Sequence, residues 1–187
     1  MNARIDYPGR KFIETLIDVP IVLPPSVAGL ALLVLFGRRG LIGSYFSEFG
    51  ITIIFTSIAV IIAQIFVAGP LYIRQAKSAF AMVDQVYESA ARTLGAGRLL
   101  TFIKVTVPLA RTGLISGIIL SFARAIGEFG ATIMVAGNLP GKTQTMPLAI
   151  YGFMQSDLTA SIALSIVLIA ISFIILILIR IISGRAA

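Results

Sequence analysis

Four long apolar stretches constrain this chain more than any other feature of its sequence. They cover about residues 16–36, 51–73, 113–136 and 158–179. A helix needs about 20 apolar residues to cross the roughly 30 Å of hydrocarbon in a bilayer, and each stretch meets that length. Only 12% of the residues are charged, about half the share that is typical of soluble domains. The sequence therefore predicts an all-α, polytopic bundle of four transmembrane helices, forming one domain over residues 1–187.

Composition excludes several classes of function. The chain has no Cys and no His, which excludes a disulfide framework, a thiol nucleophile and a His-based metal site. The net charge of +7 accompanies no nucleic-acid-binding motif, so it indicates basic cytoplasmic loops rather than nucleic-acid binding. No nucleophile and base can be paired for an intramembrane enzyme. The pattern GxxxxGK[ST] of an ATP-binding loop does not occur, so the chain is not expected to hydrolyse ATP.

The loops between the apolar stretches differ in charge, which predicts their orientation. We place the central loop, residues 74–112, in the cytoplasm together with both termini. The basic residues on that side are Arg4, Arg10, Lys11, Arg74, Lys77, Arg92, Arg98, Lys104, Arg111, Arg180 and Arg185. Those in the outer loops are Arg38, Arg39 and Lys142. This positive-inside bias predicts a multi-pass protein of the cell membrane with both termini in the cytoplasm.

The central loop contains a short polar helix, which we expect to begin after Asp84. A carboxylate there can accept hydrogen bonds from the first backbone amides, and Glu88 suits the positive dipole end of the first turn. Ala90 and Ala91 form a small, smooth surface on this helix. The surface indicates either an ordinary solvated loop helix or a docking surface that a partner's groove approaches closely.

Glycine and proline are expected to delimit the rest of this loop. Gly95 and Gly97 should end the helix, because glycine adopts left-handed conformations without penalty. Pro108 restricts Val107 and is expected to start a new element.

Two places inside the apolar stretches carry polar or helix-breaking residues. Arg124 and Glu128 are four residues apart, hence on one face of a continuous helix, and they form either a structural ion pair or the lining of an aqueous path. The break at Leu23–Ser26 contains Pro24 and Pro25, and it is either a kink in a structural helix or part of the same path.

The last loop is expected outside the membrane. It runs from Gly137 to Pro147 and is rich in turn residues. The stretch after it, Leu148–Ser156, would re-enter the bilayer or lie on its surface.

The central loop resembles the EAA loop of the permease subunits of ABC importers. The positions that match are Ala90, Ala91, Gly95, Val105 and Pro108. Ser89 occupies the place of the glutamate of that motif, and Glu88 lies one residue earlier. The stretches DVPIVLPPSVAGLALLVLFGRRG and ARAIGEFGATIMVAGNLPGKTQTMPLAIY are similar to segments of molybdate and sulfate permeases, the second more to the molybdate members. Such permeases usually have two further spans before the first one here.

The resemblance implies a type I ABC-importer permease fold, with a partner for each task that this chain lacks. It implies a second permease copy in a homodimer, two ABC ATPase subunits that hold ATP and Mg, and an extracytoplasmic oxyanion-binding protein. No cofactor or metal is expected on this chain. The residues expected to couple to the ATPase are Glu88, Ser89, Ala90, Ala91, Arg92, Thr93, Leu94, Gly95, Ala96 and Pro108. Those expected along the path of the ion are Ser26, Arg124, Glu128, Thr132 and Asn138.

The resemblance predicts a permease that imports molybdate by alternating access. Ala91→Asp is expected to uncouple it, because a charge would disrupt the alanine face. The alternatives are a permease for sulfate or another oxyanion, and a channel or secondary transporter that needs no ATPase. The chain has no internal repeat of the kind that many secondary transporters show.

Overall fold

The computed structural model describes residues 7–184, with side chains described as far as Ile181, and every regular element in that range is helical. The α-helices are α1 Arg10–Val22, α2 Pro25–Phe36, α3 Gly43–Glu48, α4 Ser57–Ala81, α5 Gln85–Thr93, α6 Arg98–Thr101, α7 Val107–Ile126, α8 Gly130–Ala136, α9 Met146–Met154 and α10 Leu158–Gly184. A π-helical turn, η1 (Phe102–Thr106), joins α6 to α7. The predicted all-α class is confirmed. Arg4 and Arg185, which entered the predicted charge asymmetry, lie outside the described residues.

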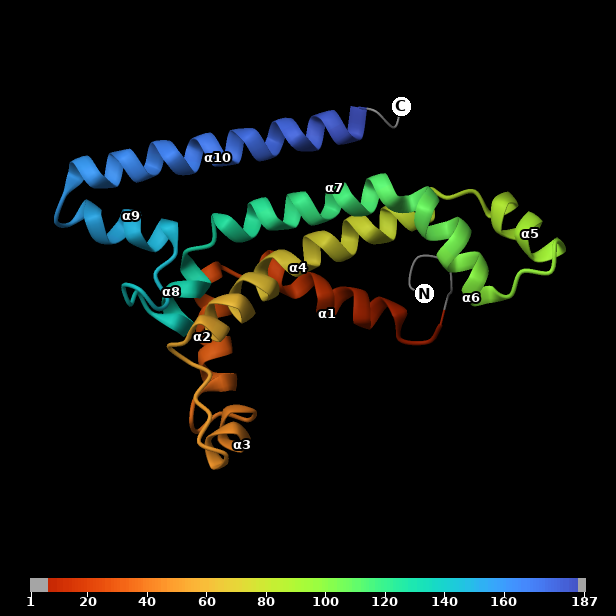
Figure 1. Cartoon of the computed structure of the whole chain (residues 1–187). Coiled ribbons are helices and arrows are strands. Elements are labelled where there is room, and N and C mark those ends of the chain that lie inside the picture. The colour runs from red at the N-terminus through yellow and green to blue at the C-terminus, as the bar shows by residue number, and fades with distance from the viewer. Residues whose placement is uncertain (1–6, 185–187) are drawn as a thin grey trace.

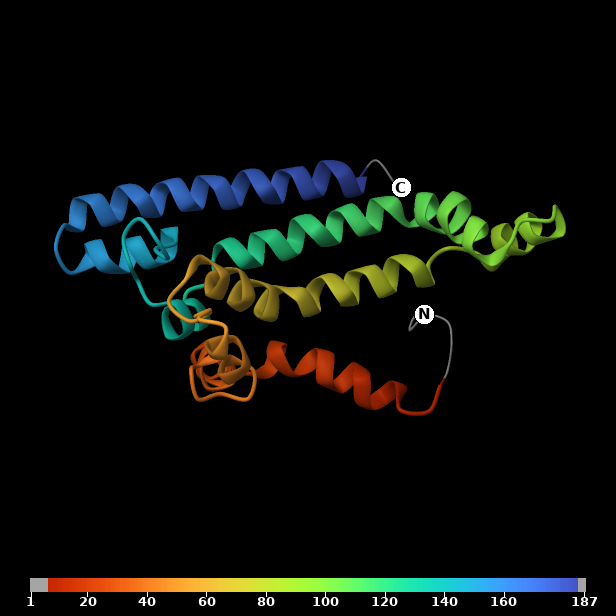
Figure 2. The same ribbon diagram turned by 60° about the horizontal axis from the view of Figure 1, so that its bottom comes forward.

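Three continuous helices are long and apolar enough to cross a bilayer. They are α4, the 29-residue run Arg98–Ile126 formed by α6, η1 and α7, and residues 158–181 of α10. The shortest has 24 residues, or about 36 Å at a rise of about 1.5 Å per residue, against roughly 30 Å of hydrocarbon. Helix α7 lies between α4 and α10, and α1 runs along α4 (Figures 1 and 2). The start of α1, the end of α10 and helix α5 lie at the same end of the bundle (Figure 1).

The first predicted span, residues 16–36, is a bent pair of helices rather than one helix. Helices α1 and α2 meet at an angle of 115°. Leu23 and Pro24 each precede a proline, which disfavours the helical region, and both adopt extended backbone with ψ of 135° and 134°. Pro25 then occupies the first turn of α2, where a missing N–H costs nothing. The prolines therefore stop one helix and start the next in a new direction.

The third predicted span, residues 113–136, is wrong as a continuous helix. Helix α7 starts earlier, at Val107, and ends at Ile126, and the separate helix α8 begins only at Gly130. Arg124 and Glu128 thus do not share one helix, although they are four residues apart. Apolar composition continues through this break, so hydropathy did not reveal it.

The second predicted span is displaced along the chain, and the fourth agrees with the structure at its start. Residues 51–56 are not helical, and α4 instead extends to Ala81. Thr56 sets the start of α4, because its Oγ1 accepts a hydrogen bond from the amide of Ala59. Helix α10 begins at Leu158, as predicted, and α9 packs against it at the end of the bundle away from α5 (Figure 1).

Pro108 lies in the first turn of α7, which begins at Val107, but the chain stays helical through it, so that α6, η1 and α7 run as one continuous helix. A proline ring clashes with the carbonyl four residues earlier, here that of Lys104. The π turn just before it widens the helix, and the amide of Val107 donates to the carbonyl of Phe102, five residues back. Gly97 was also expected to be left-handed, but its φ is −65° and it is the N-cap of α6.

Small residues let the helices approach one another closely. In α7, Gly113 and Gly117 face α4: a Cβ on Gly113 would lie 2.6 Å from the Cβ of Ala79, and one on Gly117 would lie 2.9 Å from the Cγ of Gln75. In a bilayer, where lipid tails are as apolar as Leu, such close packing holds helices together. A second core joins α2, α4 and α8, and its buried members are Leu32, Ala59, Ala63, Val67, Ala131, Val135 and Ala136.

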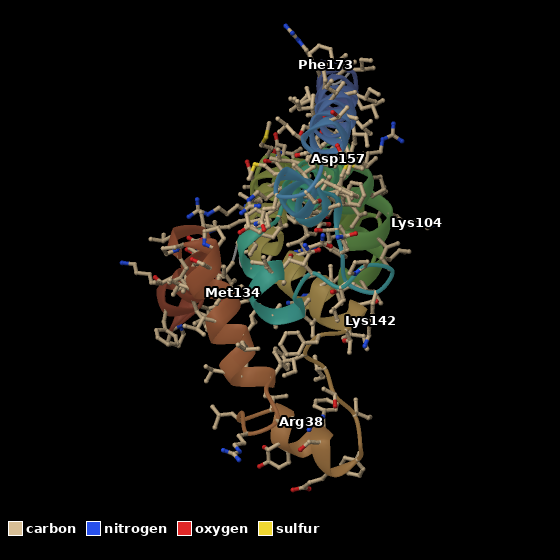
Figure 3. All side chains as sticks on the ribbon, turned by 90° about the vertical axis from the view of Figure 1, so that its left-hand side faces the viewer. Arg38, Lys104, Met134, Lys142, Asp157 and Phe173 are labelled. Atoms are coloured by element: carbon tan, nitrogen blue, oxygen red, sulfur yellow. The ribbon has the colours of Figure 1, made fainter. Side chains whose placement is uncertain are left out.

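Helix α2 leads away from the bundle into an arm that ends in α3. Figure 3 shows Arg38 at the outer end of this arm and Phe173 of α10 at the opposite side of the molecule. The arm exposes large apolar side chains, among them Leu41, Tyr45 and Phe49.

The contact between α2 and α8 makes a direct test of the packing. A Cβ on Gly29 would lie 2.7 Å from both the carbonyl oxygen of Ala131 and the Cβ of Met134. We therefore expect Gly29→Ala to push these helices apart and to cost about 1–3 kcal/mol of stability, as overpacked cores do. Gly69→Ala in α4 is the matched control, because the nearest atom to its Cβ would be 4.0 Å away. Thermal unfolding of the detergent-purified chain measures both, and equal midpoints would contradict the close contact.

Candidate functional site

Helix α5 is built as the sequence predicts at both of its ends. The amide of Val86 donates to Asp84 Oδ1 at 2.9 Å, which confirms the predicted N-cap. Glu88 lies in the first turn. At the other end Gly95 has a φ of +86°, the left-handed conformation expected of it, and its amide donates to the carbonyl of Arg92. The loop helix is therefore a defined nine-residue element.

The two faces of α5 differ in chemistry. Val86, Ala90 and Leu94 follow one another at four-residue spacing, and all three are exposed, with Leu94 88% exposed. This line of side chains is called the outer stripe below. The opposite face carries Glu88, whose side chain is only 15% exposed. The sequence suggested Ala90 and Ala91 together as a small docking surface; Ala91 is half-buried, and Ala90 is the exposed one of the two.

The other residues of the predicted coupling segment lie around this helix. The exposed members are Ser89, Arg92, Thr93, Gly95 and Pro108, and Ala96 is half-buried. Sequence reasoning missed the partner of Glu88. Thr106 of the π turn donates from Oγ1 to Glu88 Oε1 at 2.7 Å. The two residues are eighteen positions apart, and no sequence pattern indicates that they meet.

Side chains bond the backbone groups that the break between α7 and α8 leaves free, and an ion pair lies beside them. Glu128 lies in the break with 1% of its side chain exposed, and Arg124 Nη1 contacts its Oε2 at 2.7 Å. Its other oxygen accepts from the amide of Ala131 at 2.8 Å and caps α8. Gln64 of α4 donates from Nε2 to the carbonyl of Ala125 at 3.2 Å, near the end of α7. The predicted ion pair exists, but it bridges a helix break.

Three of the five residues expected along the path lie at the two helix breaks. Gly130 abuts the start of α2, since a Cβ there would lie 3.2 Å from the amide nitrogen of Ser26. The two helix breaks, with Ser26 on one and Arg124 and Glu128 on the other, are therefore neighbours. Thr132 is fully buried, and its Oγ1 has no hydrogen-bond partner within the part of the chain that the structure describes.

Asn138 organises the loop that follows α8. It donates from Nδ2 to the carbonyl of Leu148 at 3.0 Å, and its Oδ1 accepts from Gln144 at 3.1 Å. This side chain holds the loop to α9 and is not free to meet an ion in the conformation described here.

Ion pairs that the sequence did not suggest join α1 to α4. Glu14 contacts Lys77 at 2.6 Å, and Asp18 contacts Arg74 at 2.8 Å. Each acid lies on the face of α1 turned to the end of α4 that leads to α5. No group of three acidic residues able to hold a metal ion occurs among residues 7–184.

Long apolar helices joined by a polar loop helix define a multi-pass membrane protein. The family model described as the binding-protein-dependent transport system inner membrane component matches residues 3–187, and the chain belongs to that family. The chain is 44% identical over 170 residues to the probable transport system permease protein NifC of Clostridium pasteurianum. The matched segment covers 91% of this chain and 59% of NifC.

Two further relatives are named for the transport of molybdenum and of sulfate. The molybdenum transport system permease protein ModB of Escherichia coli K12 is 44% identical over 155 residues, or 82% of this chain and 68% of ModB. The probable sulfate transport system permease protein cysT of Chlorokybus atmophyticus is 38% identical over 175 residues, or 93% and 61% of the two chains. The chain thus spans about three-fifths to two-thirds of the length of these curated relatives.

The buried pair at the helix break yields a prediction on stability. Arg124→Gln should lower stability by about 3–5 kcal/mol, because it leaves the carboxylate of Glu128 buried without a counter-charge. The double variant Arg124→Gln/Glu128→Gln should recover most of the loss, because the Gln oxygen at position 128 can still cap Ala131. Thermal unfolding in detergent compares the two. A double variant no more stable than the single one would show that the pair is not structural.

Proposed function

We propose that this chain is a membrane-spanning permease subunit of an ATP-driven importer that moves molybdate across the cytoplasmic membrane. The observation that carries the proposal is α5, a capped helix with an exposed, apolar outer stripe at one end of a bundle of apolar helices. Membership of a binding-protein-dependent transport family supports it. In this proposal α5 and both termini face the cytoplasm, and the loop around Lys142 faces outward.

Molybdate is the substrate that the relatives favour. Two of the most similar proteins are named for molybdenum transport, in Escherichia coli and, as a putative permease, in Bacillus subtilis. The relative named for sulfate is less similar, at 38% identity. A permease for sulfate or another oxyanion is the alternative within the family. A channel or secondary transporter would leave α5 without a partner.

Energy enters this chain through its partners. Two ABC ATPase subunits would bind ATP and Mg, and the outer stripe of α5 would dock in a groove of one of them. A second copy of the permease would complete the path, and an extracytoplasmic oxyanion-binding protein would deliver the ion. Closure of the ATPases would move α5 and switch the bundle between inward-open and outward-open states.

The path of the ion is proposed to pass the two neighbouring helix breaks. Ser26 is exposed there, and 35% of the Arg124 side chain is exposed, so a guanidinium is available to an anion. Glu128 holds that guanidinium and reduces its attraction, which suits passage better than tight binding. Thr132 and Asn138 would meet the ion only in another conformation, because their polar atoms are now buried or bonded.

Docking through the outer stripe can be tested with one charge. Ala90→Asp should reduce co-purification of the ATPase by at least about tenfold, since burying an unpaired charge in an interface exceeds the 1.4 kcal/mol that this factor requires. Gln85→Asp is the matched control, because it places the same charge at the first residue of α5, away from the stripe. Equal ATPase recovery with both variants would contradict docking through Ala90.

The substrate and the energy source need a transport assay. Uptake of labelled molybdate by vesicles containing the assembled complex should be inhibited more by unlabelled molybdate than by sulfate, and it should stop when ATP is depleted. Stronger competition by sulfate would favour the alternative oxyanion. Uptake that persists without ATP, while the ion gradient is held, would point to a channel or secondary transporter.

A further inference from the structure

We infer that Glu88 is a positioning residue that links the docking helix to the transmembrane bundle through Thr106. This inference rests on the proposed function, because it concerns how a movement of α5 reaches α7. It assigns Glu88 to the inside of the molecule, as an acceptor for Thr106, rather than to contact with the ATPase.

The position of Glu88 separates it from the docking surface. It lies on the face of α5 opposite Val86 and Ala90, and its side chain is 15% exposed, whereas Leu94 of the outer stripe is 88% exposed. A partner that covers the stripe would not reach the carboxylate. Arg92 is on the same helix, at 3.9 Å from Glu88 Oε2, too far for a hydrogen bond.

The bond to Thr106 is the kind that can carry a displacement. Its length is 2.7 Å, its acceptor is a carboxylate, and Thr106 is 5% exposed, so water competes little for either partner. Thr106 is β-branched, which restricts its χ1 rotation. A shift of α5 therefore moves the backbone of η1 instead of being absorbed by side-chain rotation.

Two soft features border α5. A cavity of about 440 Å³ lies between the end of α4, the start of α5 and α7, with Val83, Tyr87 and Thr112 among its lining residues. The loop that follows α5 contains Gly95 and Gly97, which bend easily. With space on one side and a flexible loop on the other, the Glu88–Thr106 bond is a direct polar tie between the loop helix and the long helix.

The receiving element is suited to convert that movement into bending. Thr106 is the last residue of the π turn, a rare form that appears mostly as single turns inside α-helices and often at functional sites. Phe102, the first residue of the turn, stacks against Phe80 of α4 with ring centroids 5.8 Å apart. The turn is held by α4 at one end and by α5 at the other, directly before α7 begins.

The test is the number of molybdate ions moved per ATP hydrolysed by the complex of this chain with its ATPase. Glu88→Ala and Thr106→Val should each lower this ratio by at least about fivefold, which is the lower end of the factors by which coupled sites typically affect one another. ATPase co-purification should stay normal in both. Thr106→Val keeps the volume of the side chain, so it serves even if Glu88→Ala folds poorly.

Conservative variants and a double variant separate coupling from mere stability. Thr106→Ser and Glu88→Gln retain a donor and an acceptor and should keep most of the ratio. Glu88→Ala/Thr106→Val should be no worse than either single variant, because both remove the same bond. A structural role alone would change the thermal midpoint and the yield, but not the ratio in the complexes that assemble.

Three outcomes would overturn the inference. If Glu88→Ala abolished co-purification of the ATPase, as is expected for Ala90→Asp, Glu88 would be a docking contact. An unchanged ratio with intact assembly would remove its coupling role and leave the proposed function standing. Failure of the unmodified chain to bind the ATPase would overturn the proposed function and this inference together.

Discussion

Hydrocarbon offers no hydrogen bonds, so a helix within a bilayer can stop only where the protein itself satisfies the freed backbone groups. The break between α7 and α8 shows how this chain meets that requirement. Gln64 donates to a carbonyl near the end of α7, and Glu128 accepts from an amide at the start of α8. Arg124 then balances the charge that the cap brings into the interior. The side-chain amide of Gln64 and the ion pair between Arg124 and Glu128 thus permit a non-helical turn inside a largely apolar bundle.

Local rules predicted the loop helix well, because its determinants lie within a few residues of one another. The carboxylate of Asp84, the acid in the first turn and the left-handed Gly95 all act on their own backbone neighbourhood. Hydropathy averages over about 20 residues, so it located the long apolar helices approximately: three are continuous and long enough to cross a bilayer, and the bent pair α1–α2 lies in the first predicted stretch. The same averaging concealed the break at Gly127 and the non-helical start of the second stretch.

The contacts that sequence reasoning missed join segments far apart in the chain. Glu88 meets Thr106, Gln64 meets Ala125, and Asp18 meets Arg74. Nothing local to either partner specifies such a pairing, because it follows from how the helices pack. At Pro108 the expected element, α7, does begin, but Val107 keeps helical dihedral angles despite the proline after it, because one widened turn keeps α6 and α7 continuous. Packing also decides the surroundings of two residues expected along the path: Asn138 donates to a carbonyl of α9, and Thr132 is fully buried.

Helix α10 differs from the other long helices in how little of it the chain covers. It lies against α7 and α9 at the edge of the bundle, and most of its large apolar side chains are exposed, among them Ile166, Phe173 and Leu176. At such positions the side chain needs to be apolar, but its shape matters little within this chain, because no other described helix packs against it. Gly29 and Gly113 face the opposite condition, with backbone or Cβ atoms of another helix within 3 Å of where a side chain would begin. Exchanging Ile, Leu, Val and Phe along the outside of α10 therefore costs little packing within this chain, whereas a side chain at either glycine would push two helices apart.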